Sequence, residues 1–247
     1  MNPSWLAAKV LHNTIHKIPQ PSGGTAEKQQ IHITALEIPT VYDSVLQTVP
    51  GLHAKPPVLP PAADSAFAPA HLPSGGFDFI LHVGVAGPGG VSLEQLGHKL
   101  GYNSADAEGK YAPVVSGTAN GETQPVRGFG KGYEGMPEEI HTDIDIAELK
   151  EHLQENGIEV CSPARGPCRP YSLSSQRVVW SRDAGHYLCD FTYYASLAEA
   201  KRCVIEQAKA TPVLFLHCCP EGEPYEIEVI TDAIQKIVVW VGSRISS

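Results

Sequence analysis

The run Phe77–Ala86, FDFILHVGVA, constrains the fold of this 247-residue chain more than any other stretch. It is apolar at almost every position instead of at alternate ones, which is typical of a strand buried on both faces in the middle of a parallel sheet. The run 212–217, PVLFLH, has the same character. Helical segments alternate with these strands, so helices are expected on both faces of the sheet. The sequence therefore predicts an α/β protein, a three-layer αβα sandwich with a largely parallel twisted sheet.

Apolar spacing and capping residues define the other elements. The ranges predicted as helices are 2–16, 41–49, 143–156, 187–198 and 227–241. The further ranges predicted as strands are 31–36, 158–160 and 177–180. Asn2 is expected to cap the first helix, with Pro3 at its first position.

The length of the chain favours one domain over residues 1–247. Three stretches rich in Pro or Gly interrupt the periodic segments, at about 50–76, 103–138 and 162–176. Because they show little apolar periodicity, they are interpreted as surface insertions and not as separate domains.

Composition excludes several classes of function. The formal net charge is −9 and the 18 Lys and Arg are scattered, so no nucleic-acid partner is predicted. No apolar run reaches the roughly 18–20 residues of a membrane helix, and no secretory signal is visible, so no membrane partner is predicted. Six cysteines in a chain of this length suit reduced thiols and a cytoplasmic location. The glycines at 87–90 lack both a following Lys-Ser/Thr and a GxGxxG pattern, so no nucleotide cofactor is expected. Oligomeric state is not indicated.

Three residues of the types that a thiol hydrolase requires lie near the ends of predicted elements. Cys189 follows a turn and begins a helix, where free N–H groups and the macrodipole favour a thiolate. Glu94 follows one predicted strand and His217 ends another. Ligands of α/β sheets bind at the edge formed by the carboxyl ends of the strands, where we expect these residues to lie. Each residue also has a simpler interpretation. Cys189 could be a small buried side chain, His217 a hydrogen-bonded polar residue, and Glu94 a carboxylate in the first turn of a helix.

Longer motifs around these residues favour the catalytic interpretation. The segment 184–197, AGHYLCDFTYYASL, closely resembles the nucleophile signature of type I pyroglutamyl peptidases, a family of cysteine exopeptidases. The segments 82–87 and 91–98, HVGVAG and VSLEQLGH, resemble its second signature, and 215–217, FLH, resembles the segment with the catalytic histidine. NPSW at 2–5 and EIPT at 37–40 also match. The resemblance covers nearly the whole chain apart from two insertions and the loop between 103 and 135.

The resemblance implies a phosphorylase/hydrolase-like fold and a Cys-His-Glu triad. Cys189 would attack the carbonyl that follows an N-terminal pyroglutamate and form a thioester acyl-enzyme. His217 would protonate the departing amine, and Glu94 would fix the imidazole tautomer. The implied partners are peptides with an N-terminal pyroglutamate, and no cofactor is implied.

The resemblance also implies a pocket for the uncharged pyroglutamyl ring. Thr40, Tyr187 and Leu188 would line it, and the backbone of Val85 would meet the lactam. An apolar pocket with backbone partners suits this group, because pyroglutamate has no charged amine.

The family begins with a strand and a Gly-Phe-Gly-Pro-Phe-like loop before Asn-x-Ser-Trp, whereas Met1 directly precedes Asn2 here. A buried strand contributes about 1.5–3 kcal/mol for each apolar side chain. We therefore expect residues 1–247 as written to be inactive and poorly stable. A catalytically silent family member that acts as a binding protein is the alternative to an active exopeptidase.

A third interpretation is a metal site made by His217, Cys218 and Cys219 with Cys161 or Cys168. Zinc ligands usually come as C-x₂₋₄-C pairs, whereas Cys161 and Cys168 are seven positions apart. The spacing argues against this site, and no metal is predicted.

Overall fold

The fold is seen in a computed structural model that describes residues 2–18, 30–62, 64–116, 125–158, 181–206, 209–223 and 225–245. Its central sheet has the strand order β3-β9-β4 within these ranges. β3 and β9 are parallel, with Gly84 opposite His217, and β4 is antiparallel to β9, with Ser92 opposite His217. The sheet strands are β3 (Ile80–Val85), β4 (Ser92–Glu94) and β9 (Val213–Cys218).

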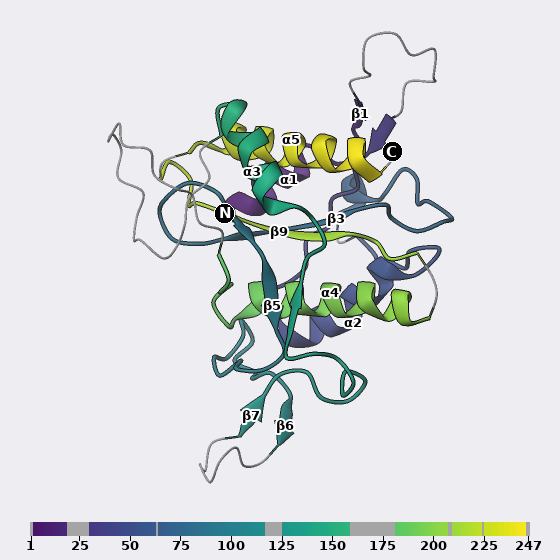
Figure 1. The fold of residues 1–247 in the computed structure, drawn as a ribbon, viewed down its shortest axis with the longest axis vertical. Coiled ribbons are helices and arrows are strands. Elements are labelled where there is room, and N and C mark those ends of the chain that lie inside the picture. The colour runs from purple at the N-terminus through teal and green to yellow at the C-terminus, as the bar shows by residue number, and fades with distance from the viewer. Residues whose placement is uncertain are drawn as a thin grey trace.

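Helices cover both faces of this sheet (Figure 1). On one face lie α1 (Pro3–Lys9), α3 (Ile146–Glu155) and α5 (Ile227–Ile245). On the other face lie α2 (Tyr42–His53) and α4 (Leu188–Ile205). The remaining elements are β1 (Ile15–Lys17), β2 (Gln30–His32), the 3-10 turn η1 (Ser65–Phe67), β5 (Leu96–His98), β6 (Val114–Ser116), β7 (Val126–Arg127) and β8 (Glu139–His141). They pair as β1-β2, β5-β8 and β6-β7, all antiparallel.

Strand β9 is buried along its whole length because it contributes to two hydrophobic cores. Val213 and Phe215 pack into the core shared with α2 and α4. Leu214 and Leu216 pack into the core shared with α1, α3 and α5. A strand between two helix layers must be apolar on both faces, which explains the unbroken run in the sequence.

The predicted α/β class is confirmed, and so are the helices at 143–156, 187–198 and 227–241. Asp145 caps α3 by accepting a hydrogen bond from the Glu148 N–H, and Asn2 caps α1 through the Ser4 N–H. These caps satisfy N–H groups that a helix start leaves free.

Several predicted boundaries were wrong. The first helix ends at Lys9 and not near residue 16, because the chain turns at Asn13, with φ of 58°, into β1. The predicted strand at 31–36 is limited to β2. Helix α2 continues through Pro50 to His53, into the range predicted as an insertion, because Leu52 and His53 are buried.

The sheet and the second insertion also differ from the prediction. A largely parallel sheet is not confirmed, since β4 runs antiparallel in the described part. Glu94 belongs to β4 and not to a helix. The stretch 103–138 is more than surface loop, because Phe129, Tyr133 and Met136 are buried in the core around α4. The insertion at 162–176, the strand at 177–180, Cys161 and Cys168 lie outside the described residues.

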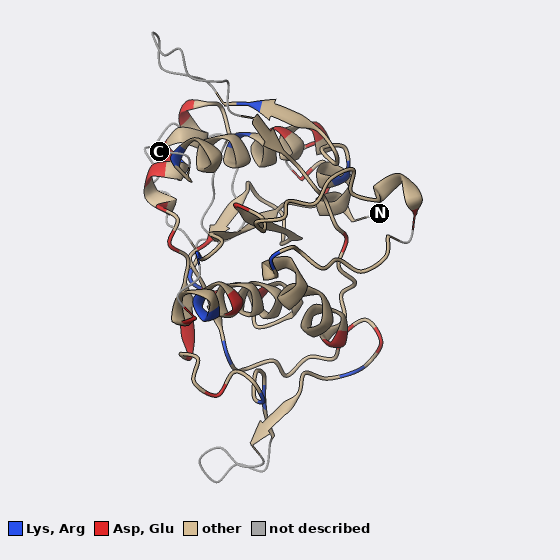
Figure 2. Ribbon diagram, turned by 90° about the vertical axis from the view of Figure 1, so that its right-hand side faces the viewer, with Lys and Arg blue, Asp and Glu red and all other residues tan. Residues whose placement is uncertain are grey.

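Charged residues of both signs are interspersed over the two helix layers (Figure 2). Within the described part of the chain, no helix combines the length and the apolar character needed to cross a membrane.

Lowering the pH from 7 to 5 is expected to destabilise the fold through His53. Its Nε2 lies 2.8 Å from Ser196 Oγ in α4, and burial lowers the pKa of His53 from 6.5 to about 4. Because the folded pKa lies below the unfolded one, this stability is present above pH 6.5 and is lost as the pH falls towards 4. The expected loss in unfolding free energy at pH 5 is roughly 1–2 kcal/mol.

Urea unfolding at both pH values measures this loss. His53→Gln keeps a side chain that can bond Ser196 but cannot gain a charge, so its stability should change less between pH 7 and pH 5. The matched control is His141→Gln, at an exposed position in β8. Equal pH dependence in wild type and His53→Gln would contradict the assignment.

Candidate active site

Cys189 is the second residue of α4, directly after the N-cap residue Tyr187 and Leu188. Its half-buried thiol is free and lies against β3. A Cβ atom built on Gly84 would lie 2.8 Å from Cys189 Sγ and 2.8 Å from Phe215 Cζ. The strand can therefore approach the thiol this closely only because residue 84 has no side chain.

Glu94 and His217 are joined across the antiparallel pair β4-β9. His217 Nδ1 lies 2.8 Å from Glu94 Oε1, which also accepts a hydrogen bond of 3.3 Å from Ser92 Oγ. Glu94 is only 1% exposed, and its backbone carbonyl accepts a 2.9 Å hydrogen bond from the Tyr193 hydroxyl. A carboxylate can only accept, so His217 donates its Nδ1–H to Glu94 and turns Nε2 to the other side of the ring.

His217 also makes a side-chain hydrogen bond with Cys189, which completes a contiguous Glu-His-Cys array. Burial by itself lowers the pKa of His217, but the hydrogen bonds with Cys189 and Glu94 outweigh burial and raise this pKa to about 9. The imidazole therefore holds its proton at neutral pH. A protonated imidazole beside a thiol favours the thiolate, the nucleophilic form of cysteine.

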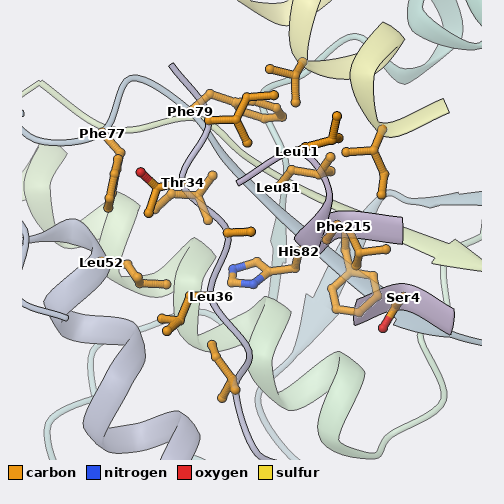
Figure 3. A pocket seen from close by; sticks show the side chains of 18 of the residues that line it. Ser4, Leu11, Thr34, Leu36, Leu52, Phe77, Phe79, Leu81, His82 and Phe215 are labelled. Carbon is orange, nitrogen blue, oxygen red and sulfur yellow. The ribbon is translucent and has the colours of Figure 1, made fainter. Parts of the chain in front are cut away.

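A cavity of about 1180 Å³ opens beside this array and runs along β3 between the two helix layers (Figure 3). The sequence-predicted residues Thr40, Val85, Tyr187 and Leu188 all line it, together with Cys189. Its lining combines apolar side chains with polar ones such as Thr34 and His82, which suits an uncharged ring that carries a polar lactam.

His82 is a polar group inside this cavity that was not predicted as a site residue. Its ring projects among Leu36 and Leu52 (Figure 3), and its Nε2 has no hydrogen-bond partner among the described residues. Burial lowers the pKa of His82 to about 3, so the ring is neutral. His82 lies in the motif 82–87, so the sequence marked this position as notable. The sequence could not show that its ring points into the cavity.

The three residues Glu94, Cys189 and His217 lie together, but not for the reason expected. They were expected to follow strands whose carboxyl ends share one edge. Because β4 is antiparallel to β9, Glu94 reaches His217 through cross-strand pairing instead. Gly84 and Ser92 are two supporting positions that sequence reasoning missed.

Gly84→Ala is expected to displace the Cys189 thiol, because the added Cβ would lie 2.8 Å from Sγ. We expect at least a tenfold slower alkylation of Cys189 by iodoacetamide and a loss of about 1–3 kcal/mol in unfolding free energy from overpacking. The matched control is Gly87→Ala in the loop after β3, where a Cβ meets no atom within 4 Å. Unchanged alkylation and stability in Gly84→Ala would contradict the observed packing.

An α/β fold that brings a half-buried thiol, an imidazole and a carboxylate into contact is typical of thiol hydrolases. Comparison with models of protein families finds no match. Pyroglutamyl-peptidase 1 of Mus musculus is 26% identical over 239 residues, which cover 96% of this chain and 81% of that protein. The Homo sapiens protein of the same name gives the same values.

Solved structures agree on the fold. A pyroglutamyl peptidase I from Bacillus amyloliquefaciens superposes with a TM-score of 0.60 at 20% identity, over 98% of this chain and 90% of that chain. A mutant pyrrolidone carboxyl peptidase from P. furiosus gives 0.55 at 17% identity, over 99% and 91%. Over nearly its whole length the chain is therefore similar to pyroglutamyl peptidases I, and it shares the fold of these solved structures.

Proposed function

We propose that this protein is a cysteine exopeptidase that removes an N-terminal pyroglutamyl residue from peptides. The observation that carries the proposal is the hydrogen-bonded array of Glu94, His217 and Cys189, in which Cys189 lines the cavity. The names of the relatives, pyroglutamyl-peptidase 1, supply the substrate class.

In this proposal the Cys189 thiolate attacks the carbonyl carbon between pyroglutamate and the next residue. The new S–C bond forms as the carbonyl electron pair moves to oxygen, where backbone N–H groups at the start of α4 stabilise the charge. His217 then gives its proton to the amine nitrogen, and the C–N bond breaks. Water, deprotonated by His217, hydrolyses the thioester and releases pyroglutamate. Glu94 holds the Nδ1–H tautomer and stabilises the imidazolium.

We assign the pyroglutamyl ring to the cavity beside Cys189. Thr40, Tyr187 and Leu188 would contact the ring, and the backbone of Val85 would bond the lactam. All four residues line the cavity, which supports the assignment. We expect this cavity to exclude peptides with a free N-terminal ammonium group. The charge would lose its hydration in the cavity without gaining a partner.

We also infer the finer architecture that the family implies, a single domain of the three-layer αβα type with a largely parallel sheet. A reduced thiol nucleophile is best maintained in the cytosol, which is where we expect the protein to act.

Purified protein assayed on pyroglutamyl-arylamide and on alanyl-arylamide tests the proposal. Hydrolysis of the first substrate alone is the expected result. Binding of a pyroglutamyl peptide without turnover would instead favour the catalytically silent alternative.

A further inference from the structure

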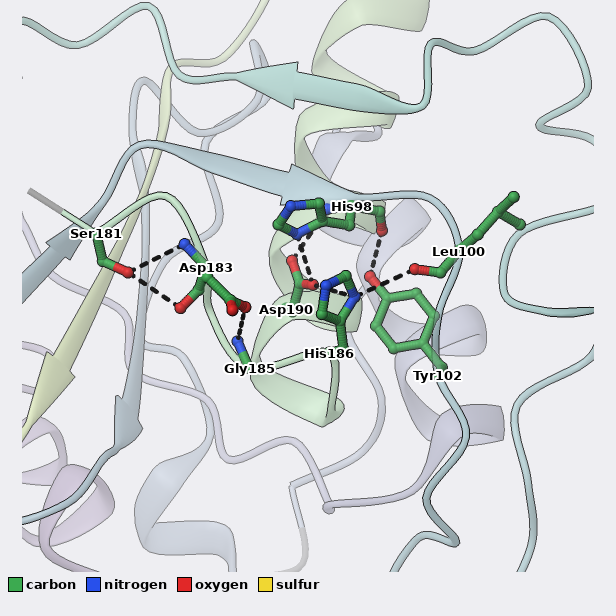
Figure 4. Close-up of polar contacts among 8 residues, drawn as sticks. All are labelled: His98, Leu100, Tyr102, Ser181, Asp183, Gly185, His186 and Asp190. Atoms are coloured by element: carbon green, nitrogen blue, oxygen red, sulfur yellow. Dashed lines mark hydrogen bonds and ion pairs between the residues drawn. The ribbon is translucent and has the colours of Figure 1, made fainter. Parts of the chain in front are cut away.

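A second cluster of side chains, all of types that can bind a metal ion, lies beside the turn that precedes α4. His98 ends β5, whereas Asp183 and His186 come from the segment 181–187 (Figure 4). Each of these three residues offers one metal-ligating atom, and the three atoms lie within 4.8 Å of one another. The array of Glu94, His217 and Cys189 uses none of them.

Asp190 lies behind both histidines and fixes their orientation. Its carboxylate is completely buried and accepts from His98 twice, with Oδ1 3.0 Å from the backbone N and Oδ2 3.0 Å from Nδ1. His186 Nδ1 lies 3.2 Å from the Leu100 carbonyl oxygen and 3.6 Å from Asp190 Oδ2. Since these partners only accept, both rings carry their proton on Nδ1.

The tautomers have a direct chemical consequence. With Nδ1 protonated, each histidine presents a free Nε2 lone pair, which is the form that coordinates a metal. A metal-ligating histidine almost always donates its other N–H to a carboxylate or a backbone carbonyl, and Asp190 and Leu100 supply these acceptors. The arrangement therefore provides ligands and their supporting acceptors together.

Asp183 completes the set with an oxygen ligand. One of its oxygens, Oδ1, accepts a 2.9 Å hydrogen bond from the Gly185 N–H, and Ser181 Oγ accepts a 3.1 Å hydrogen bond from the Asp183 N–H. These bonds hold the carboxylate beside the two rings, as Figure 4 shows, and no described residue forms a hydrogen bond with Oδ2. Asp183 is exposed and the side chain of His186 is 41% exposed, so an ion can enter from solvent.

We propose that His98, Asp183 and His186 bind a divalent transition-metal ion, with Zn²⁺ as the best fit. Two imidazoles and one carboxylate are a ligand set that zinc uses, with a fourth position open to water. Bonds of about 2.1 Å in tetrahedral geometry would place the ligand atoms about 3.4 Å apart, so side-chain movements of about 1 Å close the site. Sequence spacing does not point to the whole site, because His98 lies 85 and 88 positions before Asp183 and His186.

Binding would fasten the segment 181–187 to β5. This segment leads directly into α4, so the ion would stabilise the chain that positions the helix start. The site does not depend on the proposed peptidase activity and can be tested without it.

The test is isothermal titration of the full chain with Zn²⁺, carried out on Cys189→Ser so that the thiol cannot bind the ion. We expect one ion per chain with micromolar or tighter affinity, and a rise in Tm of about 5–10 °C at 100 times Kd. His186→Ala and Asp183→Asn, both at accessible positions, should each weaken binding at least tenfold. Asp190→Asn should weaken it 10- to 100-fold by removing the acceptor behind His98.

The matched control is His141→Ala, an exposed histidine in β8 that should bind Zn²⁺ as well as its parent. Co²⁺ gives an independent readout, since a site of nitrogen and oxygen ligands shows d–d absorption without a sulfur-to-cobalt charge-transfer band. No binding in the parent protein would overturn the proposal. Binding that His186→Ala and Asp183→Asn leave unchanged would do so as well.

Discussion

Cys189→Ser is expected to abolish the hydrolysis of pyroglutamyl-arylamide, with kcat lower by about 10⁴-fold or more. The nucleophile belongs to a group of residues that act together, and loss of one member of such a group removes most of the chemical acceleration. The serine hydroxyl lies at the same place but remains protonated, since a hydroxyl is far less acidic than a thiol. Initial rates at saturating substrate measure the effect. Circular dichroism spectra check that the variant is folded like the wild type.

The chain offers a matched control on the same helix. Cys203 is a free, half-buried thiol near the other end of α4. Cys203→Ser should retain wild-type kcat and KM, because this thiol lies more than three turns from Cys189. Full activity in Cys189→Ser, or equal losses in the two variants, would refute the assignment of Cys189 as nucleophile.

Glu94→Gln is expected to lower kcat by about 10²- to 10⁴-fold with little change in KM. Glu94 contacts His217 and not the cavity, so its loss affects the tautomer and charge of the imidazole more than substrate binding. The wild-type kcat should fall as the pH rises through about 9, where His217 loses the proton that the leaving amine requires. In Glu94→Gln this decline should move to lower pH, because one of the two hydrogen bonds that raise the pKa no longer involves a charge.

The same pKa shift predicts a change in stability with pH. The folded pKa of His217 is about 9, above its ordinary value of 6.5, so the associated stability is fully present below pH 6.5 and is lost as the pH rises through 9. Urea unfolding at pH 7 and pH 10 should show this loss in wild type and a smaller one in Glu94→Gln. Ser92→Ala is the control, since it removes only the weaker 3.3 Å bond to the same carboxylate. An alkaline decline at the same pH in wild type and Glu94→Gln would contradict the role of Glu94.

Two strands and the helix that holds Cys189 in its first turn could be predicted from the sequence because their signals are local. The runs 77–86 and 212–217 are apolar at nearly every position, and such runs are stable only between two helix layers. Cys189 follows a turn and opens a stretch with helical apolar spacing, which fixes it in the first turn of α4 whatever surrounds it. The motifs that resemble the family signatures lie on these same elements.

The tertiary structure alone decided how the remaining residues meet. Strand β4 has three residues, too few to show a period, and only its pairing with β9 makes Glu94 a strand residue beside His217. The close approach of Gly84 to the thiol and the junction of His98 with Asp183 and His186 depend on contacts between segments about 85 to 105 positions apart. Such contacts form because burying the shared core outweighs local preference, and local periodicity holds no information about them.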